Sequence, residues 1–124
     1  MRTINEELSD FGIQTFDNAL VFSLSKNPSE IELDLLRNNL VRTSFKRQAS
    51  WVIFDFSSVL VMSIGDFNHL YKTEQMIHLM GKRTIYSGMT SGLVSTIVYL
   101  DIQLFSKFSS RNLSGAFDII RNNL

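Results

Sequence analysis

The sequence predicts an α/β fold: a mixed, mostly parallel sheet with an N-terminal β-hairpin and about four helices. Three observations lead to this prediction. Two short apolar segments surround a polar dipeptide near the start, the residues at 51–54 are continuously apolar, and capped amphipathic segments alternate with β-rich runs in the rest of the chain. The 124 residues, 44% of them hydrophobic, suffice for one core, so we expect a single domain over 1–124.

The hairpin and the first helix are expected in the first third of the chain. Extended pieces at 11–16 and 19–24 are joined by Asp17 and Asn18, a polar pair that favours a tight turn. Ser29 and Glu32 have the spacing of a capping box, which predicts that a helix begins there and runs to about Phe45. Four apolar residues fall near helical spacing within it: Ile31, Leu35, Leu36 and Leu40.

The middle of the chain is expected to hold a central strand, a second helix and another strand. The continuous run Trp51–Phe54 is typical of a strand that is covered on both faces. Ser63–Asp66 offers a helix cap, and Gly81 offers a stop. The apolar stripe between them comprises Phe67, Leu70, Ile77 and Met80. A further strand is expected at 83–86.

The last third is expected to add a helix, a strand and a final helix. Ser91 is placed to cap the third helix, which would carry Leu93, Val94, Ile97 and Leu100. The β-branched residues at 94–98 suit a strand on propensity alone, and the alternating order of elements favours the helix. A strand is expected at 102–108. The final helix would place Leu113, Ala116, Phe117, Ile120 and Leu124 on one face.

Composition and charge argue against several functional classes. Twelve basic residues balance twelve acidic ones and the isoelectric point is about 6.7, which argues against nucleic acid as a partner. No apolar run is long enough to span a membrane, and there is no cysteine for a disulfide. We therefore expect a cytoplasmic protein. His69 and His78 lie nine residues apart on one predicted helix and point about 180° apart, so no metal site and no cofactor is expected.

Hydroxyl groups gather where the predicted parallel strands end, which is where sites form in such folds. This hydroxyl rim comprises Ser57, Ser58, Ser63, Ser87, Thr90 and Ser91. No strong nucleophile, base or metal ligand accompanies it, so the sequence predicts a surface that is bound or modified and no enzymatic activity. The Asp55 carboxylate is expected to accept amide hydrogens from the loop that follows it.

Three stretches carry a family resemblance. The run from Trp51 to Val59, the run from Leu79 to Met89 and the segment from Ile13 to Val21 resemble the STAS domain of anti-sigma factor antagonists, and most of all the STAS scaffold of the bacterial stressosome. The resemblance implies a STAS fold and a non-enzymatic role in bacterial stress signalling. It also implies other STAS proteins and a serine/threonine switch kinase as partners, and assembly into homo- or hetero-oligomers.

The resemblance also assigns the site. The family's phosphoacceptor opens the helix after the central strand and directly follows an Asp. In this sequence the Asp position holds Ser63, and the acceptor position holds Ile64. Because Ile64 cannot accept phosphate, either the switch is absent or Ser63 has taken it over; Ser87 matches a second acceptor. The partner-binding rim is expected to comprise Ser57, Ser58, Met62, Ile64, Gly65, Thr90 and Ser91. Asp101 stands where the family has a Gly.

Two other functions stay open at this point. The loop Ser87–Gly92 joins a strand to a helix and could offer backbone amides to a nucleotide or a small anion. No Lys follows its second Gly, so it is not a P-loop. A transporter-type STAS regulator, which needs a membrane partner, is the other alternative.

Overall fold

A computed structural model describes residues 13–16, 18–46 and 49–123. Its elements, in chain order, are β1 (Ile13–Phe16), β2 (Ala19–Ser23), α2 (Glu30–Lys46), β3 (Trp51–Asp55), α3 (Ile64–Leu79), β4 (Arg83–Ser87), α4 (Ser91–Tyr99), β5 (Phe108–Ser110) and α5 (Leu113–Asn122). The fold class predicted from the sequence is confirmed. Three expected residues, Phe11, Asp17 and Leu124, lie outside the described part of the chain.

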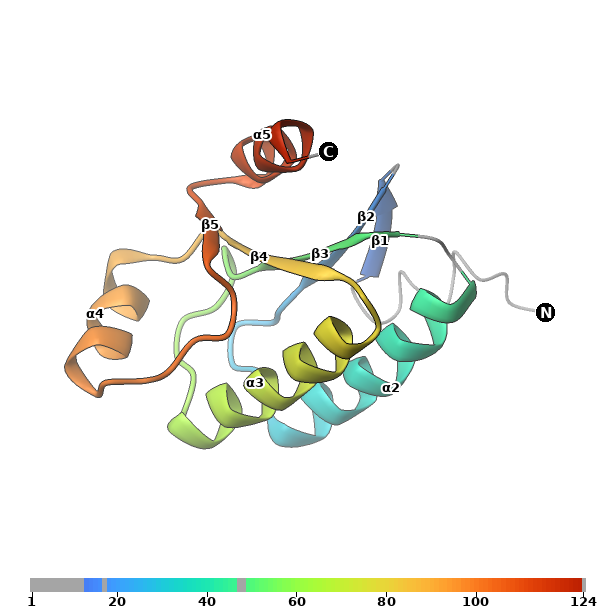
Figure 1. The fold of residues 1–124 in the computed structure, drawn as a ribbon. Helices are drawn as coiled ribbons and strands as arrows, with labels where there is room; N and C mark the ends of the chain where they lie inside the picture. Colours follow the sequence, from blue (N-terminus) through green and yellow to red (C-terminus); the bar gives the residue numbers. More distant parts are fainter. Residues whose placement is uncertain (1–12, 17, 47–48, 124) are drawn as a thin grey trace.

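One sheet with the order β1-β2-β3-β4-β5 organises the molecule (Figure 1). β1 and β2 form the antiparallel hairpin, and all other neighbouring strands are parallel. β3 is therefore the central strand, as its continuous apolar run predicts. Because the crossovers from β2 to β3 and from β3 to β4 each contain a helix, the carboxyl ends of these strands meet at one edge of the sheet.

The two faces of the sheet bury two separate cores. Side chains of alternate strand residues, such as Leu20, Val52 and Phe54, pack with buried residues of α2, α3 and α4. The intervening residues, such as Trp51 and Ile53, pack against α5 on the other face (Figure 1). This alternation follows from the two-residue period of a strand, and it explains why β3 is apolar at every position.

The rotation of α2 differs from the one predicted. Ile31 and Leu35 are 73% and 51% exposed, whereas Leu33 is buried against the sheet. Glu30 and Asp34 instead point toward α3, where both approach His69, so the residues one position further along face solvent. The predicted stripe is wrong for Ile31 and Leu35; the side chains of Leu36 and Leu40 lie outside the description.

The capping box expected at Ser29 forms only in part. The Glu32 amide donates to Ser29 Oγ at 3.2 Å, as predicted. The Glu32 carboxylate accepts a hydrogen bond from Ser25 Oγ at 2.7 Å, so it ties the loop after β2 to the helix. The helix begins at Glu30, in agreement with the sequence analysis.

Two helices end in the same hydrogen-bonding pattern, the Schellman motif. After α3, the Gly81 amide donates to His78 O at 2.9 Å and the Lys82 amide to Ile77 O at 3.2 Å; Gly81 has φ +82°. After α4, the amides of residues 101 and 102 make the equivalent bonds, and Asp101 has φ +52°. Asp101 thus adopts the left-handed conformation that glycine ordinarily supplies.

The predicted strand at 102–108 is wrong in its position. β5 starts only at Phe108 and pairs with Ile85–Ser87 of β4. The backbone amides of Phe105 and Ser106 donate to the Tyr86 hydroxyl at 3.1 and 3.2 Å. A side chain therefore takes the bonds that a strand ladder would have made.

Candidate functional site

Three loops are joined at the edge where β2, β3 and β4 end. The Leu24 amide donates to Asp55 O at 3.0 Å, and the Phe56 amide donates to Ser87 O at 2.8 Å. The loop after β3 is also bonded to the loop after β2, because the Leu60 amide donates to Lys26 O at 2.8 Å. Because backbone groups make these bonds, the loop from 56 to 63 is fixed against both of its neighbours.

Gly88 allows the loops after β3 and β4 to approach closely. Its φ is +75°, and a Cβ atom at this position would lie 3.1 Å from Ser57 Cβ and 3.2 Å from Asp55 Oδ1. Asp55 Oδ1 in turn accepts the Ser57 amide at 3.0 Å, which confirms the role predicted for this carboxylate. A larger residue at 88 would meet both backbone strain and a steric clash.

Ser63 caps α3 at this edge of the sheet. Its Oγ accepts the Asp66 amide at 3.1 Å, and Asp66 Oδ2 accepts the Ser63 amide at 3.4 Å, so the capping box is complete. The residue is exposed. Its hydroxyl therefore stabilises the helix while remaining open to solvent.

Exposed aliphatic residues surround this cap. Leu60, Val61 and Ile64 are 75%, 59% and 50% exposed. We name these three residues, together with Ser63, the α3 entry patch. Met62, expected on the partner-binding rim, is only 4% exposed and packs into the core, so that prediction is wrong. The Met62 side chain points into the core, whereas its neighbours Val61 and Ser63 are exposed. An irregular loop has no periodic pattern from which this could be predicted.

The hydroxyl rim is only partly accessible. Ser57, Ser58, Thr90, Ser91 and Gly65 are exposed, as a binding rim requires. Ser87 has no exposed surface, and its Oγ has no hydrogen-bond partner among the described residues. A kinase has no access to this hydroxyl in the present conformation.

The loop Ser87–Gly92 uses one backbone amide and one side-chain hydroxyl in bonds that hold the fold together. The Gly88 amide donates to Ser110 O at 3.1 Å. The cap of α4 is Thr90, one residue before the predicted Ser91, because Thr90 Oγ1 accepts the Leu93 amide at 3.2 Å. Leu93 and Ile97 are buried, which confirms that this segment is a helix despite its β-branched residues.

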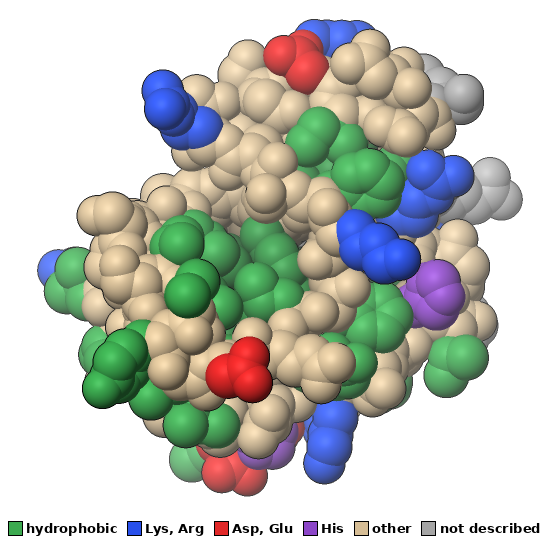
Figure 2. All heavy atoms as spheres, turned by 60° about the vertical axis from the view of Figure 1, so that its left-hand side comes forward, with side chains coloured by type: hydrophobic (Ala, Val, Ile, Leu, Met, Phe, Trp, Pro, Cys, Tyr) green, Lys and Arg blue, Asp and Glu red, His purple; other side chains and the backbone are tan. Residues whose placement is uncertain are grey.

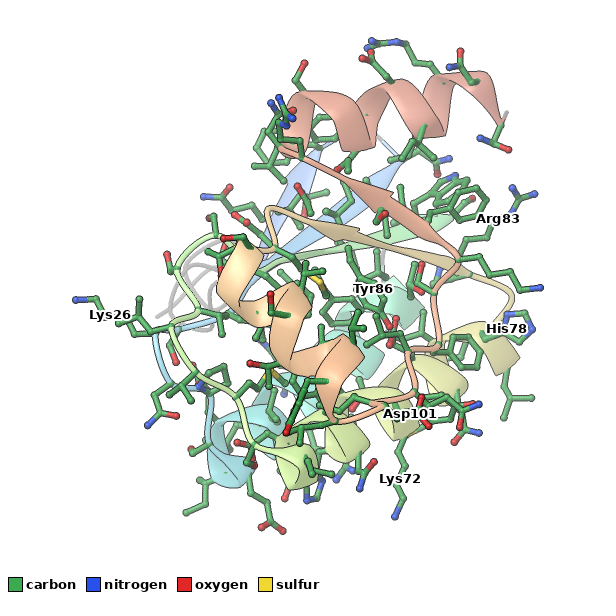
Figure 3. All side chains as sticks on the ribbon, turned by 90° about the vertical axis from the view of Figure 1, so that its left-hand side faces the viewer. Lys26, Lys72, His78, Arg83, Tyr86 and Asp101 are labelled. Carbon is green, nitrogen blue, oxygen red and sulfur yellow. The ribbon has the colours of Figure 1, made fainter. Side chains whose placement is uncertain are left out.

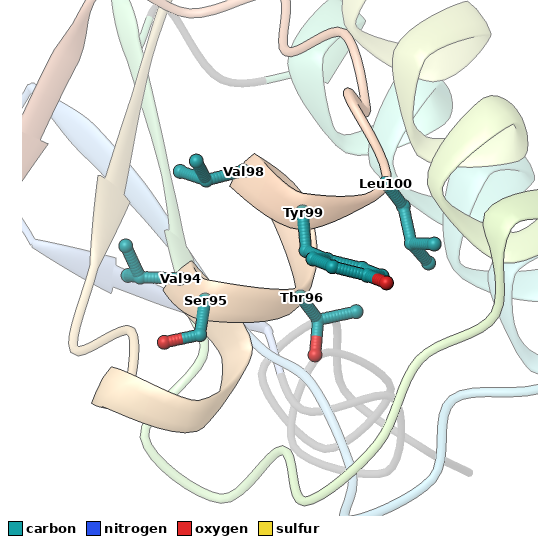
Figure 4. Close-up of a pocket in the computed structure, with 6 residues that line it drawn as sticks. All are labelled: Val94, Ser95, Thr96, Val98, Tyr99 and Leu100. Atoms are coloured by element: carbon teal, nitrogen blue, oxygen red, sulfur yellow. The ribbon is translucent and has the colours of Figure 1, made fainter.

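α4 presents an apolar face that the sequence analysis missed. Val98 and Tyr99 are 74% and 89% exposed, and Val94 and Leu100 are nearly half exposed. Figure 4 shows these four side chains around a shallow pocket along the helix. The sequence did contain a signal, because the segment holds more apolar residues than one helical stripe can bury; Val94 and Leu100 are among those that are exposed.

A buried acid, Glu74, also escaped the sequence analysis. It is 1% exposed, and its carboxylate accepts a hydrogen bond from the Tyr86 hydroxyl. Burial raises the pKa of Glu74 from 4.5 to about 7, although hydrogen bonding to the side chains of Tyr86 and Thr84 lowers it in part. The spacing could have revealed it, since Glu74 lies between Leu70 and Ile77 on the apolar stripe of α3.

The two histidines belong to different surroundings. His69 Nε2 lies 3.1 Å from Glu30 Oε1, and the His78 ring packs 5.4 Å from the ring of Phe105. Within the residues described, no three His, Cys, Asp or Glu side chains come together as a metal site. No helix in this part of the chain has the length and hydropathy to cross a bilayer.

Several solved structures share this fold. An RsbS variant from Moorella thermoacetica superimposes with a TM-score of 0.76 at 15% identity, over 90% of this chain and 94% of that one. The chain has the STAS fold. A structure described as the molecular architecture of the stressosome gives 0.74 at 15% identity, over 90% and 96% of the two chains. The unphosphorylated anti-sigma factor antagonist SpoIIAA gives 0.66 at 12% identity, over 88% and 97%.

Comparison of the sequence with family models and with curated proteins finds no relative. The assignment of the STAS fold therefore rests on superposition with solved structures that are 11–15% identical to the chain, with TM-scores of 0.66–0.76.

Proposed function

We propose that the chain is a non-enzymatic STAS scaffold or anti-sigma factor antagonist in bacterial stress signalling. It binds related STAS proteins and a serine/threonine switch kinase through protein contacts. The observation that carries the proposal is the α3 entry patch: an exposed serine at a helix N-terminus, set among three exposed aliphatic side chains at the carboxyl edge of the sheet. The structural neighbours named above are antagonists and stressosome components, which supports the same role.

Ser63 is the residue on which the proposed switch acts. The position equivalent to the family's acceptor holds Ile64, which is half exposed and has no hydroxyl, so Ile64 contributes apolar contact. A phosphate on Ser63 would add nearly two negative charges beside the Asp66 carboxylate, which is hydrogen-bonded to the Ser63 amide. The helix N-terminus tolerates this charge. A partner that covers Leu60, Val61 and Ile64 would have to desolvate it, and binding would weaken.

The partner surface is expected to continue from the α3 entry patch onto α4. Thr90 and Ser91 begin α4, and the loop that carries them is held against the loop after β3 by the bond from Phe56 to Ser87. The exposed apolar face of α4 starts one turn further on, at Val94. An interface core of apolar residues with a hydroxyl-rich rim is the arrangement that protein partners use.

The first test combines phosphorylation and binding. The purified chain is incubated with the cognate switch kinase and ATP, and mass spectrometry locates the phosphate. We expect it on Ser63, with no modification in Ser63→Ala and normal modification in Ser58→Ala, a neighbouring exposed serine. A chain that stays unmodified and also fails to co-purify with any STAS partner would contradict the proposal.

The second test uses two leucines of comparable exposure. Leu60→Asp places a charge in the α3 entry patch, and Leu79→Asp places one at the opposite end of α3, where Leu79 is 84% exposed. We expect the first substitution to abolish co-purification with the STAS partner and the second to leave it unchanged. Equal loss in both variants would show that the patch is not the contact.

A further inference from the structure

A face rich in positive charge lies at the opposite end of β4 from the hydroxyl rim, where α3 ends. Two grooves of about 480 and 530 Å³ meet there, because His78 and Phe105 line both of them. The Lys and Arg residues that line the two grooves are Arg37, Lys72, Lys82, Arg83 and Lys107. No Asp or Glu belongs to the described lining of either groove. We name the two grooves together the α3 exit face.

Most of this charge has no acidic partner. Lys72, Arg83 and Lys107 are exposed and form no ion pair with any described residue. Arg37 is already paired with Asp34 at 3.4 Å. The chain as a whole has twelve basic and twelve acidic residues, so the α3 exit face is a local concentration of positive charge. Such a surface attracts an acidic partner.

The figures show how this charge is distributed. In Figure 2, Lys and Arg side chains lie beside a His on the face turned forward, with hydrophobic side chains next to them. In Figure 3, Arg83, His78 and Lys72 follow one another along the right and lower edge of the view, and Lys26 lies on the opposite side. Asp101, which is labelled in the same view, lines neither groove. The positive charge therefore extends along the face, which suits an extended acidic partner.

Exposed apolar side chains belong to the same face. Leu79 and Met76 of α3 are 84% and 40% exposed, and both line a groove together with Phe105. The Phe105 ring makes edge-to-face contacts with the rings of Tyr71 and His78, with ring centres 5.5 and 5.4 Å apart. Methionine and aromatic side chains adapt well to apolar partner residues. One partner can therefore meet apolar contact and positive charge at this face together.

The edge of β4 at this face does not accept an added strand. β5 pairs only with Ile85–Ser87, so it leaves the edge of β4 at Arg83 and Thr84 uncovered. The segment before β5 crosses this edge, where Ser106 Oγ donates to Thr84 O at 2.5 Å. A partner in extended conformation would find this carbonyl group already bonded. A helix satisfies its own backbone groups, so it can lie in the grooves without bonds from this edge.

We propose that the α3 exit face binds an acidic amphipathic helix of a partner protein. The apolar side of that helix packs on Leu79, Met76 and Phe105, and its carboxylates pair with Lys72 and Lys107. Residues three and four positions apart share one face of a helix, so a helix presents an apolar stripe flanked by acids. A bare polyanion would leave the apolar side chains unused, and a flat membrane surface would leave the grooves unfilled. This contact does not depend on the function proposed for the α3 entry patch.

The test is fluorescence anisotropy with a labelled peptide of about 18 residues and the full chain at low salt. Leucines repeat in the peptide at the i, i+3, i+4, i+7 spacing, and glutamates fill the other positions. One control peptide has Lys in place of every Glu, and another has the same composition with the leucines scattered around the helix. We expect saturable binding of the acidic peptide with a dissociation constant below about 100 µM, and at least roughly tenfold weaker binding of both controls.

Two results would overturn the proposal. One is a control peptide that binds as tightly as the acidic peptide. The other is absence of binding of the acidic peptide, and sedimentation with phosphatidylserine vesicles would then show whether the face binds an anionic membrane instead.

Two pairs of substitutions test the location. Lys72→Glu is expected to weaken peptide binding roughly tenfold, whereas Lys26→Glu makes the same charge change on the opposite side of the molecule and is expected to alter the affinity less than about twofold. Leu79→Ser is expected to weaken binding roughly fivefold, and Val98→Ser, at a residue of α4 that is 74% exposed, is its matched control. All four residues are exposed, so the variants are expected to fold normally. Equal effects within either pair would refute the site.

Discussion

Replacement of the buried Glu74 by Gln is expected to change the dependence of stability on pH. The folded-state pKa of about 7 lies above the ordinary 4.5, so the folded protein binds this proton more tightly than the unfolded chain. The contribution of Glu74 to stability is therefore fully present below about pH 4.5 and is lost as the pH rises through about 7. At about 1.4 kcal/mol per pKa unit, the loss by pH 8.5 is on the order of 3 kcal/mol.

Urea unfolding of the wild type and of Glu74→Gln between pH 5 and pH 8.5 measures this effect. The variant keeps a polar group for the Tyr86 hydroxyl and has nothing to ionise, so it is expected to gain stability over the wild type as the pH rises. Both proteins contain His69 and His78, so the difference between their curves isolates Glu74. Glu32→Gln, a matched change outside the core, is expected to keep the wild-type slope. Parallel curves for wild type and Glu74→Gln would refute the reasoning.

The other predictions concern single contacts and are measured by urea unfolding. Ser63→Ala removes the cap of α3 and is expected to lower the free energy of unfolding by about 1 kcal/mol; no change would contradict the capping role. Tyr86→Phe leaves the buried Glu74 carboxylate and two partly buried amides without their partner and is expected to cost about 2 to 3 kcal/mol, with faster amide exchange at 105 and 106; unchanged exchange there would contradict it. Asp101→Gly relieves a positive φ and is expected to stabilise by up to about 1 kcal/mol, whereas Gly81→Ala is expected to destabilise by about 1 kcal/mol; the same sign in both would contradict the left-handed assignment.

The order and type of the elements could be predicted from sequence because each depends on local patterns. The apolar run of β3 indicates a central strand, and Ser63 with Asp66 marks the start of α3 whatever surrounds it. The helix from 91 to 99 was predicted against its β-branched composition because a sheet of parallel strands needs a crossover there. These features survive in the structure with boundaries shifted by one or two residues.

The predictions that fail concern positions that are set by contacts with residues far away in the sequence. β5 is short because the Tyr86 hydroxyl, 19 and 20 residues away, binds the amides of Phe105 and Ser106. Met62 packs in the core, and the loop that carries it is bonded to the loops after β2 and β4. No local sequence pattern predicts this. Glu74 is the exception, since its position on the apolar stripe was visible in the sequence. A charged residue among the apolar positions of a helix indicates a buried ionisable group.

The single tryptophan offers a natural reporter for one half of the molecule. Trp51 lies in the smaller core, beneath α5, whereas α2, α3 and α4 pack on the opposite face of the sheet. α5 covers this core with two buried residues, Ala116 and Ile120. Its detachment would admit water to the indole and shift the fluorescence to longer wavelength while the α3 face remained intact. Emission recorded during partner binding can therefore separate events at the two faces of the sheet.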